Sequence, residues 1–154
     1  MEFNDLMKAL AENAGVAEGF SPDEDGVVRV GRGNLVLAFM EVPEKRAILV
    51  WSSVGVLPEE GADALMAELL KANFMGRGVN GGTLSLSDDG EAYLHQILQL
   101  DLLDKAAFLQ ALEDFIFVLA RWTQAFADFR PEESEAQELS PETGEVDVSG
   151  FIRV

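Results

Sequence analysis

The strongest periodic pattern in the sequence lies between residues 105 and 129. Its large apolar side chains follow one another at intervals of four, three, four, three and four residues: Phe108, Leu112, Phe115, Leu119, Trp122 and Phe126. This spacing places them on one face of an α-helix. Pro131 follows, where helical hydrogen bonding cannot continue. The pattern predicts one long amphipathic helix whose apolar face the rest of the chain must cover.

Three segments rich in β-branched and aromatic residues precede this helix. They are VVRV (27–30), LVLAFMEV (35–42) and AILVWSSV (47–54), separated by GRGN and PEKR. They predict three strands of an antiparallel meander. In the middle strand, alternate residues are apolar on both faces, with Leu35, Leu37 and Phe39 on one and Val36, Ala38, Met40 and Val42 on the other. We therefore expect helices over one face and a partner or further helix over the other.

Two shorter helices flank the meander. The first has apolar residues at helical spacing, Phe3, Leu6, Met7 and Leu10, and ends near Gly15. The second is predicted to begin at Pro58, Glu59 and Glu60, since negative charge is favourable at a helix N-terminus. Its apolar side chains are Leu65, Met66, Leu69, Leu70 and Phe74.

A hairpin completes the order of elements. TLSL (83–86) and EAYLHQIL (91–98) flank the turn SDDG, whose pair Asp89 and Gly90 favours a type I′ turn. The fold class is therefore α+β: a helix, a three-stranded antiparallel meander, a helix, a β-hairpin and a long C-terminal helix.

The glycines of NFMGRGVNGG match the spacing GxGxxG of a dinucleotide loop, at Gly76, Gly78 and Gly81. Such a loop must leave a strand and open a helix, so that the helix N-terminus faces the phosphates. Here the glycines follow a predicted helix and precede a predicted strand. They therefore indicate a turn between helix and strand, and Arg77 is interpreted as solvated.

Composition limits the classes of partner. The chain has 154 residues, 48% of them hydrophobic, which is sufficient for one domain with a core. It carries 28 acidic and 11 basic residues, a formal net charge of −17, which repels nucleic acid and anionic membranes and attracts basic partners. No apolar run is long enough to span a bilayer, and the N-terminus does not resemble a signal peptide. We expect a cytoplasmic protein without nucleic-acid binding or membrane insertion.

The sequence offers little for catalysis. It has no cysteine, and its single histidine, His95, has no adjacent serine or aspartate arrangement that would form a triad. Glu113 and Asp114 lie beside the apolar face of the long helix. An acid and base pair needs a pocket that separates the environments of its members, and the sequence reveals none.

Metal binding has one weak candidate, the run Asp23, Glu24 and Asp25. A calcium loop that begins at Asp23 requires glutamate at its twelfth position, which is Asn34 here. The run is therefore predicted to be a turn. We expect no enzyme activity, no catalytic residue, no metal and no cofactor.

The C-terminal residues 131–154 form a segment of their own. They contain seven acidic groups and one arginine, a net charge of 1 − 7 = −6, which disfavours an independent core. Val146, Val148, Ile152 and Val154 alternate in a strand pattern. We divide the chain into an α+β domain at 1–130 and an acidic tail at 131–154. The tail either imitates a bound client chain and competes with it, or packs as an ordinary terminal strand.

Several stretches together resemble the class I type III secretion chaperones, the Tir-chaperone family. LVWSSVGVLPEE (49–60) is similar to the family's third strand and entry to the second helix, and LLDKAAFLQALEDFIFVLARW (102–122) to its terminal helix. LLKANFMGRGVNGGTLSLSDDGEAYL (69–94) is similar to its most recognisable block. The resemblance covers about residues 1 to 130, and the tail departs from it.

The resemblance implies a non-catalytic, ATP-independent homodimeric chaperone that holds the N-terminal segment of a secreted effector in extended form. It implies that the effector contacts the first helix and the meander, at Leu6, Leu10, Val28, Val30, Leu37, Phe39, Ile48 and Val50. It implies a dimer interface at Leu69, Phe74, Leu84 and Leu86. The alternative is a dimeric interaction or regulatory module of the same fold, unrelated to secretion, and a more distant one is a small-ligand binder or enzyme.

Overall fold

The protein is represented by a computed structural model that describes residues 1–131. Eight main elements follow one another: α1 (Phe3–Ala14), β1 (Val27–Arg32), β2 (Leu35–Val42), β3 (Ala47–Val56), α2 (Ala62–Asn73), β4 (Thr83–Leu86), β5 (Glu91–Gln99) and α3 (Lys105–Asp128). Three short 3₁₀ turns, η1 (Pro43–Lys45), η2 (Phe74–Gly76) and η3 (Leu100–Leu102), connect some of them. The α+β class and the predicted order of elements are confirmed. The predicted tail strand lies in residues 132–154, outside the described residues.

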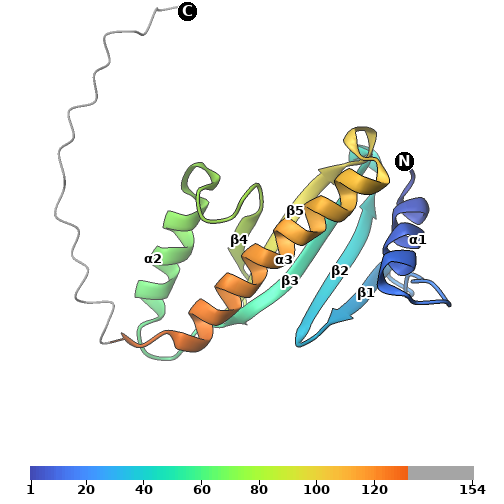
Figure 1. The fold of residues 1–154 in the computed structure, drawn as a ribbon. Helices are drawn as coiled ribbons and strands as arrows, with labels where there is room; N and C mark the ends of the chain where they lie inside the picture. The colour runs from blue at the N-terminus through green and yellow to red at the C-terminus, as the bar shows by residue number, and fades with distance from the viewer. Residues whose placement is uncertain (132–154) are drawn as a thin grey trace, which may run out of the picture.

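The strands form one antiparallel sheet in the order β1-β2-β3-β5-β4. The meander is therefore extended by the second strand of the hairpin, and β4 becomes an edge. Figure 1 shows α3 crossing the sheet diagonally, with α1 beside one end of the sheet and α2 beside the other. Alternation along the strands then gives the sheet one face covered by helices and one that the described helices leave open.

The covered face holds the hydrophobic core. Val28, Phe39 and Val50 are paired across β1, β2 and β3, so they lie on the same face, and all three are buried. The apolar face of α3 packs against them through Phe108, Leu112, Phe115 and Leu119, as its periodicity predicts. Trp122 is half-buried and donates a hydrogen bond from its indole nitrogen to the Gly78 carbonyl at 3.0 Å.

The opposite face of the sheet carries apolar side chains with no helix over them in residues 1–131. Met40, Leu49 and Ile97 are paired across three strands, and each is at least partly exposed. The expectation that both faces of the meander are apolar is therefore correct. Helices within residues 1–131 cover one of these two faces.

The second helix begins later than predicted. Gly61 precedes it with a φ of 78°, a left-handed conformation, so α2 starts at Ala62 and Glu59 and Glu60 lie in the preceding loop. The hairpin turn also differs from type I′, which requires two successive residues with positive φ. Only Gly90 in this turn has a positive φ, 79°, and the Gly90 N–H donates to the Ser87 carbonyl at 3.0 Å.

Candidate binding groove

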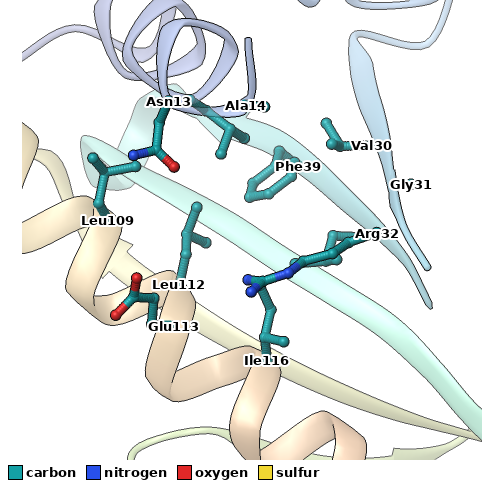
Figure 2. Close-up of a pocket in the computed structure, with 12 residues that line it drawn as sticks. Asn13, Ala14, Val30, Gly31, Arg32, Phe39, Leu109, Leu112, Glu113 and Ile116 are labelled. Atoms are coloured by element: carbon teal, nitrogen blue, oxygen red, sulfur yellow. The ribbon is translucent and has the colours of Figure 1, made fainter. Parts of the chain in front are cut away.

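A groove lies on the helix-covered side, between α1, the β1 and β2 hairpin and the first half of α3. Its volume is about 340 Å³. The residues that line it are Leu10, Asn13, Ala14, Val30, Gly31, Arg32, Leu37, Phe39, Leu109, Leu112, Glu113 and Ile116. Figure 2 shows these side chains converging from two helices and two strands.

The floor of the groove is apolar and belongs to the core. Leu37, Phe39 and Leu112 are buried there. Leu10 and Ile116 form part of the walls and are only partly buried, although both pack against the core. An open space with an apolar floor is the usual form of a site for an apolar side chain of another molecule.

Polar groups surround the mouth of the groove. Asn13 comes from the end of α1, Arg32 from the end of β1 and Glu113 from α3. Figure 2 shows the Arg32 guanidinium extending beside Ile116, with the Glu113 carboxylate further along α3. Neither charged group takes part in an ion pair within residues 1–131. The site therefore combines an apolar floor with a cation and an anion at its rim.

The groove adjoins a free backbone edge, because β1 is the first strand of the sheet. The edge is closed at Val27, whose N–H donates to Asp23 Oδ1 at 2.9 Å and whose carbonyl accepts from Asp23 N at 2.9 Å. In an antiparallel strand, backbone groups point to the same side at every second residue. The backbone groups of Arg29 and Gly31 therefore point away from β2.

The residues predicted to contact an effector divide into two sets. Leu6, Val28, Ile48 and Val50 are fully buried in the core of this single chain, each 1% exposed or less. They belong to the hydrophobic core and do not line the groove. Leu10, Val30, Leu37 and Phe39 line the groove. Contact with an effector stays a prediction, and these four are the predicted residues that the groove brings together.

Sequence reasoning missed five lining residues that decide the shape and charge of the groove. Leu109 and Ile116 continue a second apolar row on α3 next to the main one, and their spacing from Leu112 was a usable signal. Asn13, Arg32 and Glu113 come from three separate elements. No local pattern in the sequence brings them together.

The predicted dimer residues lie at the other end of the sheet, around α2 and β4. Leu69 and Leu84 are buried within the chain, whereas Leu86 is 41% exposed and Phe74 is 64% exposed. A shallow hollow of about 160 Å³ is lined there by Met66, Leu69, Leu70, Asn73, Leu84, Ser85 and Leu86. Leu70, which lines the hollow, and Met75, in the turn η2 after α2, are more than two-thirds exposed. Leu70, Phe74, Met75 and Leu86 together form a surface of large apolar side chains, each more than 40% exposed.

Polar side chains on the open face are joined by hydrogen bonds. Glu91 accepts from Ser53 at 2.5 Å and from Tyr93 at 2.7 Å, which lowers the pKa of Glu91 and raises that of Tyr93. His95 Nδ1 lies 3.2 Å from Ser85 Oγ. Within residues 1–131, no group of three or more His, Cys, Asp or Glu could hold a metal ion.

Two other sequence motifs have structural roles. Asp23 Oδ1 accepts from Asp25 N at 3.0 Å as well as from Val27 N, so the acidic run is a turn, as predicted. The GxGxxG glycines lie between α2 and β4, as predicted for a turn between helix and strand. None of the helices in the described part of the chain is long and apolar enough to cross a membrane.

One comparison with known proteins identifies a family. The model of the Tir chaperone protein (CesT) family matches residues 5–123. No curated protein sequence matches the chain at a significant level.

Solved structures show the same fold at low sequence identity. A chain of the ExsC–ExsE complex has a TM-score of 0.70 at 16% identity, covering 82% of this chain and 97% of that one. A chain of the complex between the Yersinia pestis type III secretion chaperone SycH and a fragment of YscM2 has a TM-score of 0.61 at 17% identity, covering 77% of this chain and 98% of that one. A chain of the ExoU–SpcU complex of the Pseudomonas aeruginosa type III secretion system has a TM-score of 0.62 at 14% identity, covering 80% of this chain and 97% of that one.

Proposed function

Because the chain belongs to the Tir chaperone protein (CesT) family, we propose that it binds the N-terminal segment of a type III secreted effector and holds it in extended form. The observation that carries this proposal is the groove with an apolar floor beside the free β1 edge. Similar folds were solved as the HopA1–SchA chaperone–effector complex and as SycH with a fragment of YscM2. The alternative of a module unrelated to secretion has no separate observation in its favour.

The bound chain is held by burial of apolar side chains and by backbone hydrogen bonds. Its apolar residues enter the groove against Leu37 and Phe39, between Leu10 and Val30. Its backbone adds to the outward-pointing groups of Arg29 and Gly31, which is the usual way an extended peptide joins a sheet edge. Neither interaction requires ATP, a metal or a catalytic residue, so we propose a chaperone without enzyme activity.

A homodimer is part of the same proposal. The exposed apolar side chains around α2 and β4, Leu70, Phe74, Met75 and Leu86, become buried against a second copy. Leu69 and Leu84 support this surface from within the chain. Two copies then present two grooves, one at the β1 end of each sheet.

Retention of exported proteins in a secreting bacterium tests the proposal. The tagged full chain should retain one or a few exported proteins, each through a segment near its N-terminus mapped by truncation. Ile116→Glu, which places a charge in the wall of the groove, should weaken binding of the mapped segment at least about tenfold. Leu102→Glu is the matched control, because Leu102 is 80% exposed and does not line the groove.

Thermal unfolding of both variants must first match that of the wild type, so that a loss of binding reports on the groove. Recovery of cytosolic regulators alone would exclude the secretion function. Equal binding by the Ile116→Glu and Leu102→Glu variants would exclude the groove as the binding site.

A further inference from the structure

The two edges of the sheet differ in charge. β1 contains Arg29 and Arg32 and no acidic residue, whereas the other edge strand, β4, has the uncharged sequence TLSL. Arg29 is paired with Asp23, and Arg32 takes part in no ion pair within residues 1–131. β1 is thus a positively charged strand in a chain with a net charge of −17. Despite the acidic field of the whole chain, the unpaired Arg32 guanidinium attracts a carboxylate on a strand added at this edge, and β4 has no such cation.

The free part of the β1 edge is short. The loop residue Asp23 already occupies the backbone groups of Val27, so the outward-pointing groups belong to Arg29 and Gly31. Open space surrounds the position that a Cβ of Gly31 would take. The edge therefore accepts a strand of about four residues, the usual lower range of strand length.

The same chain contains an acidic segment with the required pattern. In the sequence, Val146, Asp147, Val148 and Ser149 alternate apolar and polar residues. When such a segment pairs with an edge strand, its two valines lie on one face and Asp147 lies on the other. On β1, the side chains of Val28, Val30 and Arg32 lie on the face of the groove, and that of Arg29 lies on the opposite face.

The segment is close enough along the chain to reach this edge. Seventeen residues, 129–145, separate it from the end of α3 and span up to about 60 Å when extended. The groove residue Ile116 lies twelve residues before the end of α3, about 18 Å along the helix. The connection is therefore long enough without any change in the described domain.

We propose that residues 146–149 add to β1 of the same chain as a sixth strand. Val146 and Val148 cover the groove beside Val30, and Asp147 lies on the side of Arg29. This inference rests on the proposed function in one respect, since the groove is the site assigned to the effector. The tail then occupies that site until an effector segment displaces it.

Paramagnetic relaxation in the full-length protein, without any effector, tests where the tail lies. The chain has no cysteine, so Thr143→Cys provides a single site for a nitroxide label. Amide signals of β1 and of the groove side of α1 should broaden and recover when the label is reduced. Broadening confined to the end of α3, or centred on β4, would overturn the proposal.

Two pairs of variants sharpen this test. Val146→Asp with Val148→Asp should abolish the broadening at β1, whereas Leu139→Asp, an equivalent change outside the segment, should preserve it. Gly31→Pro removes an edge N–H that does not pair with β2 and should also abolish it, while Gly31→Ala should preserve it. Persistence of the signal in the double valine variant or in Gly31→Pro would contradict strand addition.

A second sample mixes chains that carry the nitroxide but no ¹⁵N with chains that carry ¹⁵N but no nitroxide. This mixture shows whether the tail comes from the same chain or from another copy. Broadening that appears only in the mixture would overturn addition to the same chain. With an effector segment in hand, a tail that occupies the groove nine-tenths of the time weakens apparent affinity about tenfold, and the double valine variant restores it. The relaxation measurement needs no effector, so failure of the proposed function and failure of this inference remain distinguishable.

Discussion

At the scale of single residues, Asn73 joins the end of α2 to the edge strand β4. Its side-chain nitrogen donates to the Leu84 carbonyl, and its side-chain oxygen accepts from the Leu84 N–H, both at 2.8 Å. We expect Asn73→Ala to lower the free energy of unfolding by about 1 to 3 kcal/mol, because both backbone groups lose their partner. Chemical denaturation measures this loss. Asn73→Asp keeps only the acceptor, so its free energy of unfolding should lie between those of the wild type and Asn73→Ala.

The turn at Asp23 makes stability depend on pH. The hydrogen bond from the Val27 N–H lowers the pKa of Asp23, and Arg29 and the Asp25 N–H contribute in the same direction. The unfolded chain therefore takes up its proton first as pH falls, so this stabilisation is present above about pH 3.8 and is lost below it. The difference in Tm between wild type and Asp23→Ala should shrink from about pH 7 to about pH 3. A constant difference would contradict the role of the ionised carboxylate.

At the scale of elements, the turn between α2 and β4 depends on Gly78. A Cβ at this position would lie 2.6 Å from the Cβ of Ala72, and the Gly78 carbonyl accepts the hydrogen bond from Trp122. Gly78→Ala must push α2 and the turn apart, and we expect a loss of about 1 to 3 kcal/mol. Gly31→Ala is a matched control, since its Cβ meets open space. Equal stability of the two variants would show that the turn adapts without strain.

At the scale of the whole molecule, the apolar surface around α2 and β4 leads to a test of the dimer. Phe74→Asp should convert the dimer to a monomer in light scattering without unfolding it, because Phe74 is exposed in the single chain. Val56→Asp changes an equally exposed side chain on β3 and should leave the mass unchanged. Leu84→Asp does not separate dissociation from unfolding, since Leu84 is 4% exposed and a lone buried charge is strongly unfavourable. A monomeric wild type at micromolar concentration would contradict the interface.

The net charge of −17 predicts how salt changes effector binding. The charge steers basic segments toward the protein, whereas burial in the groove holds them. Raising salt should therefore slow association more than it speeds dissociation, as measured by surface plasmon resonance. A steep fall of affinity in proportion to the logarithm of salt concentration would instead indicate binding dominated by charge.

The sequence by itself determined the elements whose side chains repeat with the period of their own backbone. The seam from Phe108 to Leu119 defined α3, and alternation in LVLAFMEV defined β2 with two apolar faces. The turn at Asp23 was equally local, because its carboxylate binds backbone groups within four residues. In each case the deciding interactions lie within one element or one turn, so the pattern and the structure agree.

Tertiary structure alone decided which apolar residues form the core and which remain open to a partner. Leu84 and Leu86 occupy the same face of β4, yet only Leu84 is covered, because α2 and Asn73 pack over it. The groove exists because α1, α3 and the hairpin of β1 and β2 leave an open space above the buried Phe39. Its rim brings together Arg32 and Glu113 from distant parts of the chain. Burial and charge at such a site depend on contacts between elements. The periodic pattern within one element does not predict these contacts.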